Sequence, residues 1–435
     1  MEIHYSAASN QKDVSRETIV IFYEHLSREY DAITNIKNAL LRQCRAPINV
    51  VVAQINLEWR QALKYARRHG ISVLMLPGYY AAIPDGLWTV PFKKINKHLV
   101  TINFHHEQIP APFNRSVQLP HDALSKKGCV HLAWSERFKH SLEETGVPSD
   151  LIKVTGNPRA DLLILNEKRS CKSALARTFG LDVKKMWVLY CDNRYSTAKQ
   201  AIKNQAKNTL YRDLNERLYS SKEQLDEDTR ELLLAQMHEL PDSFFEKFEL
   251  IYRPHPGVAA SNDIDERVRV IAEGSIGIWL NVSDLLLVWN STTAFEADVL
   301  GIPVLRHEPL PNNPEFRAIG LDSYQCIKEL REIDVDLIRQ TREAELRARN
   351  YQLHYGTVDG KSADRIASAV FDAMENPPHL ESAPPTTSIW REYAVFALRG
   401  IASDFMYKTK LLSTAKWPKA AYVHRDEVSH QSTHQ

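Results

Sequence analysis

The stretch SDLLLVWNSTTAFEADVLGIPVLRHEP, Ser283 to Pro309, decides the fold predicted for this chain. It opens with a short apolar run, Leu285 to Trp289, that has the length of a buried strand. Four residues of good N-cap type follow, and Thr293 with Glu296 predicts a capping box at the start of a helix. A glycine ends that helix and a proline leads into the next apolar run. The stretch therefore predicts a strand–helix–strand unit.

The turn between this strand and this helix is rich in hydrogen-bonding groups. Asn290, Ser291, Thr292 and Thr293 lie there. A helix start with hydroxyls and free backbone N–H groups can hold an anion, typically a phosphate. The local pattern alone fits an ordinary, well-capped helix equally well. The segment RPHPG just upstream, residues 253–257, favours the phosphate site.

Length and composition indicate a soluble protein of two domains. The 435 residues exceed one ordinary domain, and a hydrophobic content of 43% with 25% charged residues is typical of globular proteins. The net charge of +1 gives no indication of a general nucleic-acid binder. Five scattered cysteines without a C-x-x-C pair indicate a reducing compartment and no structural zinc. Without a signal peptide or an apolar run of roughly 20 residues, a cytoplasmic location is expected.

Strands and helices alternate through the first part of the chain. The predicted strands are 18–23, 48–52, 71–76, 98–104, 130–133 and 151–154, and the helices between them include 25–41, 57–68 and 135–145. This alternation predicts a parallel sheet with helices on both faces. In such sheets, ligands bind in the loops at the carboxyl ends of the strands.

Polar side chains follow two of these predicted strands. His105, His106, Glu107 and Gln108 come directly after the strand 98–104. They form either a solvent-exposed strand end or the rim of an active site, with Glu107 as acid or base. Adjacent histidines on a strand point to opposite faces, so no metal site is expected. Asn157 and Arg159 lie in a similar strand-to-helix turn, TGNPR, at the same edge of the sheet.

The second part of the chain repeats this layout, with predicted strands at 186–191 and 248–252 before the opening stretch. Asp192, Asn193 and Arg194 follow the first of them, as a capped turn or as part of a site. A polar helix is predicted within 207–238, and the loop 312–317 is expected to rim a sugar pocket. His255 stands between two prolines, which stiffen the backbone and fix the imidazole for a contact with a phosphate or leaving group.

The segments R-P-H-P-G and N-S-T-T-x-F-E-A-x-x-L-G-x-P-V resemble the donor-site signature of GT-B glycosyltransferases. That resemblance implies an α/β fold with two Rossmann-like domains facing a cleft and C-terminal helices crossing back. More narrowly, the segments are similar to those of bacterial capsule and lipopolysaccharide Kdo transferases and sialyltransferases. The segment VTGNPRADLL, residues 154–163, resembles the same group. In these relatives an H-P motif and an S/T motif hold the phosphate of a CMP-activated sugar, and no metal or other cofactor is expected.

Carried over to this sequence, the resemblance implies three sets of site residues. The donor set is Arg253, His255, Pro256, Asn290, Ser291, Thr292, Thr293, Glu296, Asn193 and Arg194. The acceptor or sugar set is His105, His106, Gln108, Asn157 and Arg159. The catalytic set is Asp192 as a carboxylate nucleophile, Glu107 as acid/base, and His255. In an inverting enzyme, Glu107 or Asp85 would instead be the base and Asp192 a binding residue.

The predicted domains are an acceptor domain at 1–165, a linker at 166–180, a donor domain at 181–385, C-terminal helices at 386–425 and a disordered tail at 426–435. The helix predicted from Ile389 to Leu412 carries aromatic and basic residues. It either buries its apolar stripe against the first domain or contacts the cytoplasmic face of the inner membrane.

The function implied by the resemblance is transfer of a sugar, Kdo or another ulosonic acid, from a CMP-linked donor to a glycan or glycolipid acceptor. The same motifs occur in enzymes that polymerise glycerol phosphate from CDP-glycerol, and a glutamate like Glu296 occurs in relatives that use UDP-sugars. A polyol-phosphate transferase, a UDP-sugar transferase or 2-epimerase, and a catalytically inactive binding module therefore remain alternatives. The donor, the acceptor, the linkage and the stereochemical outcome stay open.

Overall fold

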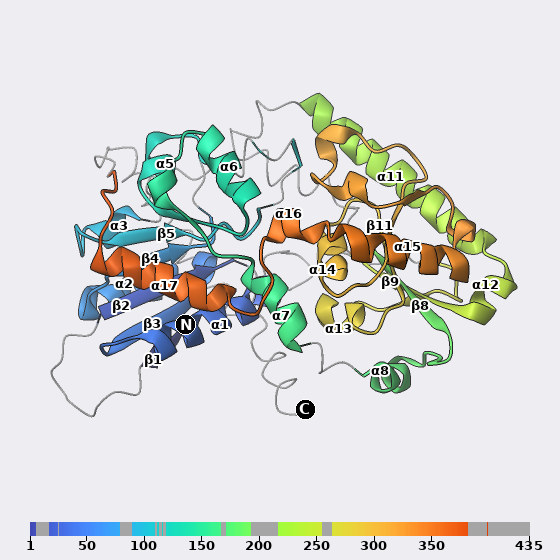
Figure 1. The fold of residues 1–435 in the computed structure, drawn as a ribbon, viewed down its shortest axis with the longest axis horizontal. Helices are drawn as coiled ribbons and strands as arrows, with labels where there is room; N and C mark the ends of the chain where they lie inside the picture. The colour runs from blue at the N-terminus through green and yellow to red at the C-terminus, as the bar shows by residue number, and fades with distance from the viewer. Residues whose placement is uncertain are drawn as a thin grey trace. The chain divides into compact units, whose positions relative to one another are not determined.

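The computed structural model describes residues 1–5, 17–24, 26–78, 89–108, 111–112, 115, 119–166, 171–192, 216–254, 263–381 and 398. These residues form two compact units (Figure 1). Unit 1 comprises the described residues within Met1–Gln108, within Val117–Arg159 and from Asp359 onward. Unit 2 comprises those within Ile109–Ser116 and Ala160–Val358.

Unit 1 is built on a seven-stranded sheet with the order β1-β3-β2-β4-β5-β6-β7. Its strands are β1 (Glu2–Tyr5), β2 (Glu17–Tyr23), β3 (Ile48–Gln54), β4 (Val73–Leu76), β5 (Val100–Asn103), β6 (Val130–Ala133) and β7 (Ile152–Val154). β1 runs antiparallel to β3, and every other neighbouring pair is parallel. The carboxyl ends of β2 to β7 therefore meet at one edge of the sheet.

Helices cover both faces of this sheet. They are α1 (Leu26–Gln43), α2 (Ile55–His69), α3 (Val90–Lys93), α5 (Ala123–Lys127), α6 (Glu136–Glu144), the start of α7 (Pro158–Asn166) and α17 (Ser362–Glu375). Alternate residues of a strand point to opposite faces. Ile19 and Ile21 of β2 accordingly share a core with α1 and α17, whereas Val20 and Phe22 share one with α2 and α3. A strand buried on both faces explains the uninterrupted apolar run of β2.

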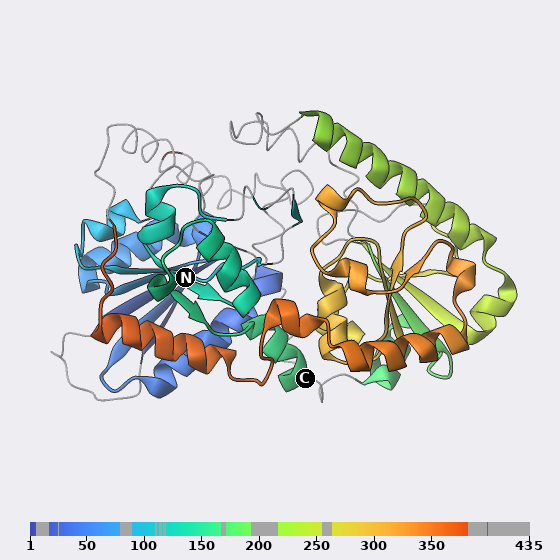
Figure 2. The ribbon, with the colours of Figure 1, turned by 45° about the horizontal axis from the view of Figure 1, so that its top comes forward.

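The helix α17 brings a late part of the chain back to unit 1 (Figure 2). Its apolar face contributes Ile366 and Val370 to the core beside α1. Arg42 of α1 donates to the Asp364 carboxylate at 2.7 Å. Nε of Arg365 donates to the carbonyl of Thr155, at the end of β7, also at 2.7 Å. The prediction placed the helices that cross back at 386–425, of which only residue 398 is described, so that prediction stays untested; the return seen here is made by α17, which the prediction did not assign to it.

Unit 2 is built on a six-stranded, entirely parallel sheet with the order β10-β9-β8-β11-β12-β13. Its strands are β8 (Met186–Cys191), β9 (Phe248–Arg253), β10 (Arg269–Val270), β11 (Leu285–Val288), β12 (Val304–His307) and β13 (Cys326–Ile327). The helices are α8 (Lys172–Phe179), α11 (Glu216–Glu239), α12 (Asp242–Lys247), α13 (Ile276–Leu280), α14 (Thr293–Val299), α15 (Val335–Ala348) and α16 (Tyr351–Tyr355). Two parallel α/β units confirm the predicted fold class.

The division of the chain differs from the predicted one in two places. The predicted linker 166–180 contains the helix α8 and belongs to unit 2, and the change from unit 1 to unit 2 falls earlier, inside α7. Residues from Asp359 onward belong to unit 1, although the prediction assigned them to the donor domain up to residue 385. The reason is that the apolar stripe of α17 completes the core beside α1 and not a core of unit 2.

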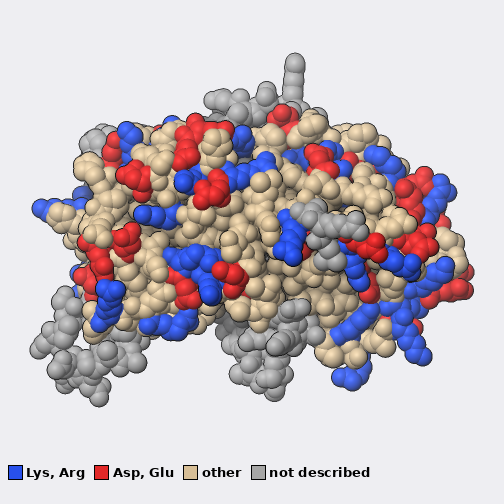
Figure 3. All heavy atoms as spheres, in the orientation of Figure 1, with Lys and Arg blue, Asp and Glu red and all other residues tan. Residues whose placement is uncertain are grey.

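Acidic and basic side chains are intermixed on the face of the molecule shown in Figure 3. The described part of that face has no large area of a single charge sign. This agrees with the nearly equal numbers of acidic and basic residues, 54 and 55.

Candidate functional site

The turn between β11 and α14 lies at the carboxyl edge of the unit 2 sheet. The Ser291 hydroxyl accepts a hydrogen bond from the backbone N–H of Thr293 at 3.3 Å and donates to the Thr293 hydroxyl at 2.9 Å. Thr292 is the N-cap of α14, but its backbone is helical, with a ψ of −8°, and its side chain makes no capping bond. All three residues are half-buried. The turn thus presents two linked hydroxyls at a helix start.

The predicted capping box between Thr293 and Glu296 is wrong, although the helix does begin at Thr293. With Thr292 as the N-cap, Glu296 stands one residue too far along the helix for the reciprocal bond. Glu296 is instead buried in the first turn of α14, where its side chain is 9% exposed. Its predicted contact with the donor stays a prediction.

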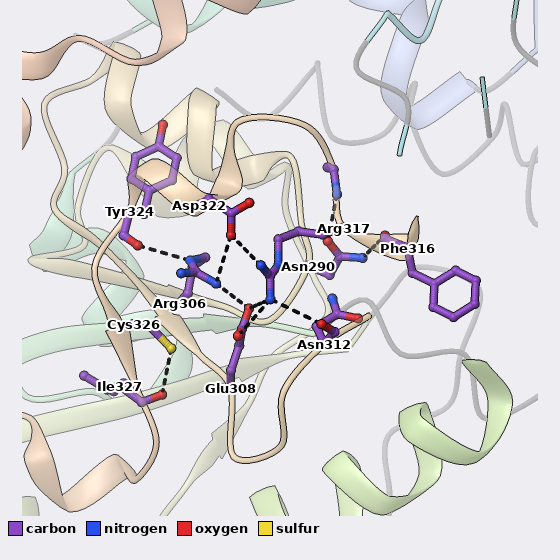
Figure 4. A network of polar contacts seen from close by, with 11 residues as sticks. Asn290, Arg306, Glu308, Asn312, Phe316, Arg317, Asp322, Tyr324, Cys326 and Ile327 are labelled. Carbon is purple, nitrogen blue, oxygen red and sulfur yellow. Dashed lines mark hydrogen bonds and ion pairs between the residues drawn. The ribbon is translucent and has the colours of Figure 1, made fainter. Parts of the chain in front are cut away.

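Asn290 ties this turn to the loop that follows β12 (Figure 4). Its Nδ2 donates to the carbonyl of Phe316 at 2.6 Å, and its Oδ1 accepts from the N–H of Ala318 at 3.1 Å. Both ends of the amide are therefore used to fix backbone. Within these contacts Asn290 positions the loop, and a direct contact with a donor stays a prediction.

The same loop contains a buried network of charges (Figure 4). Glu308, which is 4% exposed, pairs with Arg306 and accepts from Nη2 of Arg317 at 3.1 Å. Arg306 also donates through Nε to the carbonyl of Tyr324 at 3.1 Å, and Arg317 pairs with the exposed Asp322. Charges this deeply buried need such partners. The sequence carried a sign of this network, because Arg306 is a charged residue inside the short parallel strand β12 and Glu308 follows directly after it.

Asn312 lies on this loop and is 5% exposed. Within the described part of the chain, neither its Oδ1 nor its Nδ2 has a hydrogen-bond partner, although Arg317 bonds its backbone carbonyl. An unsatisfied buried amide is uncommon in folded proteins. The side chain is therefore a polar group whose partner is still to be identified, in the loop that was predicted to rim a sugar pocket.

Asp192 follows β8 at the same edge of the sheet. It is 5% exposed and accepts a hydrogen bond of 2.6 Å from the hydroxyl of Tyr252, on the neighbouring strand β9. Burial, together with the Asp192 carboxylate, raises the pKa of Tyr252. The tyrosine therefore stays protonated and keeps donating, which fixes one oxygen of the carboxylate.

Arg253, at the end of β9, does not extend freely from the strand. Its guanidinium donates to the carbonyls of residues 271–274 at 2.7 to 3.3 Å and lies over the ring of Trp279. These contacts give Arg253 a structural role, which is holding the segment after β10. They argue against the predicted donor contact, because most of its N–H groups already have backbone partners.

Four other predicted donor residues lie outside the described residues. They are Asn193, Arg194, His255 and Pro256. The same holds for Asp85, the alternative base. Their roles stay predictions.

In unit 1, the polar residues after β5 are largely buried among strand ends. Nε2 of His105 lies 2.9 Å from Nδ1 of His131 on β6, and both rings are fully buried. Nε2 of His131 faces the carbonyl of Lys126 at 3.1 Å, so it carries the proton and Nδ1 accepts from His105. Burial lowers the pKa of His131 to about 4 and that of His105 well below its usual range. The pair is neutral.

Gln108 joins two strand ends by its side chain. Its Nε2 donates to the carbonyl of Leu132 at 2.9 Å and its Oε1 accepts from the N–H of Trp134 at 2.7 Å. Gln108 and His105 are 5% and 0% exposed. Such burial argues against the predicted acceptor contacts for both residues, and we assign them a structural role. Glu107 between them is half-buried, and its acid/base role stays a prediction.

The other three acceptor candidates, His106, Asn157 and Arg159, line one narrow cavity of about 20 Å³ in unit 1. Nδ1 of His106 bonds the carbonyl of Pro77 at 2.7 Å. Oδ1 of Asn157 accepts from the N–H of Arg159 at 2.9 Å and so caps α7. The sequence prediction grouped these three with His105 and Gln108 as acceptor contacts, a role that stays a prediction, and it did not include Glu29 of α1, which lines the same cavity. An acidic residue in the first turn of a helix is too common to be a signal.

Among the described residues, no group of three or more His, Cys, Asp or Glu side chains is arranged to hold a metal ion. None of the helices described is both long enough and apolar enough to span a bilayer.

Comparison with known proteins supports the fold. No family model and no curated protein matches the sequence. Among solved structures, the wall teichoic acid polymerase TagF is similar, with 14% identity, a TM-score of 0.51 and coverage of 82% of this chain and 89% of that one. A variant of TagF gives 12% identity, a TM-score of 0.50 and coverage of 84% and 91%. The S. aureus MnaA–UDP structure is also similar, with 13% identity, a TM-score of 0.48 and coverage of 85% of this chain and 100% of that one. The chain therefore has a GT-B-type fold.

Proposed function

We propose that this protein is a transferase that uses a nucleotide-linked donor and moves a polyol phosphate or a sugar onto a hydroxyl-bearing acceptor. The observation that carries the proposal is the pair of linked hydroxyls, Ser291 and Thr293, at the β11–α14 turn of a GT-B-type fold. Hydroxyls and backbone N–H groups at a strand-to-helix turn suit the phosphates of a nucleotide. The carboxyl edge of a parallel sheet is also where α/β proteins bind ligands.

The donor that we favour is a polyol phosphate linked to a cytidine nucleotide, as in CDP-glycerol. Similarity to a wall teichoic acid polymerase supports this choice over the predicted CMP-linked ulosonic acid. The narrower Kdo hypothesis, with a lipopolysaccharide or capsule acceptor, rests on the motif resemblance alone. We keep it as the second candidate.

In the transfer we propose, a hydroxyl oxygen of the acceptor attacks the phosphorus atom that carries the polyol. A new P–O bond forms, the bond to the bridging oxygen breaks, and CMP leaves with the electron pair of that bond. Negative charge grows on the leaving phosphate, where Ser291, Thr293 and His255 would stabilise it. The proton of the acceptor hydroxyl passes to a base, for which Glu107 is our candidate. If the donor is a sugar, Asp192 is instead our candidate nucleophile.

Binding of nucleotides tests the donor assignment. The full chain is screened by thermal shift with CDP-glycerol, CMP, UDP and GDP, and binders are titrated by calorimetry. Stabilisation by the cytidine ligands is the expected result, and a response to UDP alone would overturn the choice. Replacing both Ser291 and Thr293 by alanine should weaken binding by about tenfold or more. Ser283→Ala is the control, because that buried serine bonds the carbonyl of Trp279 and lies before β11.

Turnover tests the chemistry. The release of CMP from CDP-glycerol or from a CMP-sugar is followed with a polyol or glycan acceptor. We expect Asp192→Ala to abolish transfer from a CMP-sugar while nucleotide binding persists. Near-normal turnover would remove Asp192 from the chemistry.

A peripheral contact of residues 386–425 with anionic membranes also remains a proposal, and co-sedimentation with vesicles containing anionic lipid tests it.

A further inference from the structure

The solvent side of α2 carries charges of one sign. Its buried side contributes Trp59 to the core of unit 1. Its exposed cations are Arg60, Lys64, Arg67 and Arg68. A helix turns by about 100° per residue, so these four positions lie within one stripe that is about 100° wide. From Arg60 to the end of α2, the sequence contains no acidic residue.

The stability of the helix does not explain the whole stripe. Cations in the last turn of a helix complement its dipole, which accounts for Arg67 and Arg68. Arg60 and Lys64 stand before that turn. Like charges four residues apart, as in Arg60 with Lys64 and Lys64 with Arg68, repel each other and destabilise a helix slightly. The stripe therefore points to a use outside the fold.

The charge of the stripe is not neutralised by neighbouring carboxylates. Exposed cations of other helices are paired, as Arg339 of α15 is with Asp336 at 3.2 Å. Within the described part of the chain, Lys64, Arg67 and Arg68 have no carboxylate partner. Their positive charge thus remains available to an anion outside the protein.

The loop after α3 adds two lysines at one end of the stripe. An aromatic pair packs α3 against α2, with ring centres 5.9 Å apart. Asn96, in the loop, donates through Nδ2 to the carbonyl of Ile71 at 2.9 Å, just after the end of α2. Lys94 and Lys97 are exposed and stand on either side of Asn96. The cations therefore continue from the helix onto this loop.

Two acidic residues adjoin this surface, and both have partners. Glu58 of α2 accepts through one oxygen from the N–H of Gln54 and pairs through the other with the N-terminal ammonium group. Glu17 accepts from the hydroxyl of Ser72, the residue after Ile71. Even where Glu17 offsets one cation, the surface keeps a positive charge.

The chain that follows α17 reaches the same end of unit 1. Nζ of Lys93, in the last turn of α3, donates to the carbonyl of Glu381 at 3.3 Å, and the Glu381 carboxylate pairs with Lys127 at 3.3 Å. An extended chain spans at most about 3.6 Å per residue, so residue 386 lies within roughly 18 Å of Glu381. Residues 386–425, which include aromatic and basic residues, therefore start close to the loop after α3.

We propose that the surface formed by α2 and the loop after α3 docks on an anionic lipid bilayer. Anionic headgroups attract clustered Lys and Arg side chains, whose long stems adapt to a flat surface. The aromatic rings of α2, Trp59 and Tyr65, are buried and cannot stack on the bases of a single-stranded nucleic acid. The inference goes beyond the proposed function and does not depend on the identity of the donor. The docking surface, called the basic face below, comprises Arg60, Lys64, Arg67, Arg68, Lys94 and Lys97.

Co-sedimentation of the full chain with lipid vesicles tests the docking. One vesicle preparation is phosphatidylcholine alone, and the other contains about one third phosphatidylglycerol. We expect binding to the anionic vesicles only, and at least about fivefold weaker binding when the salt concentration rises from about 0.1 M to about 0.5 M. Equal binding to both preparations, or binding to neither, would overturn the proposal. So would equally tight binding of a DNA duplex, which would identify a site for any polyanion.

A charge-neutralising variant locates the contact. Lys64→Gln/Arg67→Gln/Arg68→Gln removes three cations without carboxylate partners among the described residues, so the thermal unfolding midpoint should change little. We expect its binding to anionic vesicles to be weaker by about tenfold or more. Unchanged binding would assign the membrane contact to another part of the chain, such as residues 386–425, and would overturn the proposal.

The matched control is Lys184→Gln/Arg331→Gln/Arg339→Gln, which removes the same charge from exposed positions of unit 2. It should bind the anionic vesicles as the unaltered chain does. A loss equal to that of the α2 variant would reveal an effect of net charge alone and contradict a defined docking face.

A fluorescent label identifies the face that touches the lipid. An environment-sensitive dye is attached at Gln61→Cys, beside the cations of α2, in a chain with Cys171→Ser at the exposed cysteine. Its emission should shift to the blue with anionic vesicles, because the dye enters the interface. The same dye at Gln340→Cys, an exposed position of α15, should not shift. A shift at position 340 without one at position 61 would place another face on the membrane and overturn the proposal.

Discussion

The carboxyl edges of the two sheets differ in the polar groups that they bury and in how these groups are paired. In unit 1 three of the buried groups, His105, His131 and Gln108, are neutral and bond one another or backbone. In unit 2 a buried charge is held instead, because the Glu308 carboxylate is shared between the guanidiniums of Arg306 and Arg317. Neutral groups lose little when they leave water, whereas each buried charge has a large desolvation cost. The unit 2 edge is therefore stable only while Glu308 and its two guanidiniums stay paired, and the unit 1 edge only while its histidines stay uncharged.

The largest effect that we expect comes from breaking the charged network. Glu308→Ala leaves Arg306 and Arg317 without their shared carboxylate and should lower the free energy of unfolding by about 3–5 kcal/mol. Urea unfolding followed by tryptophan fluorescence measures it. Asp322→Ala is the control. Its side chain is 68% exposed, so its removal should cost less than about 1 kcal/mol. Equal losses in the two variants would contradict the comparison.

A second, smaller effect tests the neutral edge by pH. The pKa of His131 is about 4 in the folded chain against an ordinary value of 6.5. The unfolded chain therefore binds a proton that the folded chain does not bind between these values, so stability is full above pH 6.5 and falls as the pH drops toward 4. The loss attributable to His131 is about 3 kcal/mol at the lower end.

Unfolding experiments in urea at several pH values between 7 and 4 measure this loss. His131→Gln should reduce the pH dependence, and His140→Gln, at a side chain that is 72% exposed, should not. An unchanged slope in His131→Gln would show that the histidine pair is not the source.

The smallest effect separates stability from function in unit 2. Tyr252→Phe removes the hydroxyl that bonds Asp192 and should cost about 1 kcal/mol of stability. Tyr190→Phe is the matched control, because the ring of Tyr190 lies beside that of Tyr252 and its hydroxyl bonds Nδ1 of His307 at 3.0 Å. If Asp192 takes part in transfer, Tyr252→Phe lowers turnover and Tyr190→Phe does not. The same turnover in both variants would place Asp192 outside the chemistry.

The regular parts of the fold could be predicted from the sequence. The bounds of β6 and β8 match the predicted strands. An apolar run of strand length identifies a buried strand of a parallel sheet even when its neighbours in the sheet are unknown. The edge strands β1, β10 and β13 were not predicted. β10 and β13 have only two residues each, too few for a pattern, and β1 is defined by its antiparallel pairing with β3.

The site could be predicted only in part, because a sequence shows which polar residues end a strand but not which of them are paired. His105 and His106 are neighbours of one type, yet one is sealed against His131 and the other lines a cavity. Glu29 and Glu58 look alike in sequence and differ only in what stands beside their second oxygen. Long-range neighbours of this kind are set by packing and not by local spacing.

The return of α17 to unit 1 has a consequence for how the chain folds during its synthesis. The core beside α1 takes Ile366 and Val370 from a helix that lies near the end of the described residues. A ribosome synthesises the N-terminal part of the chain first. One apolar face of the unit 1 sheet therefore stays partly uncovered until α17 has left the ribosome. During this interval unit 2 can already complete its own sheet. The unit encoded first is thus finished last, and the nascent chain is most exposed to aggregation on its first domain.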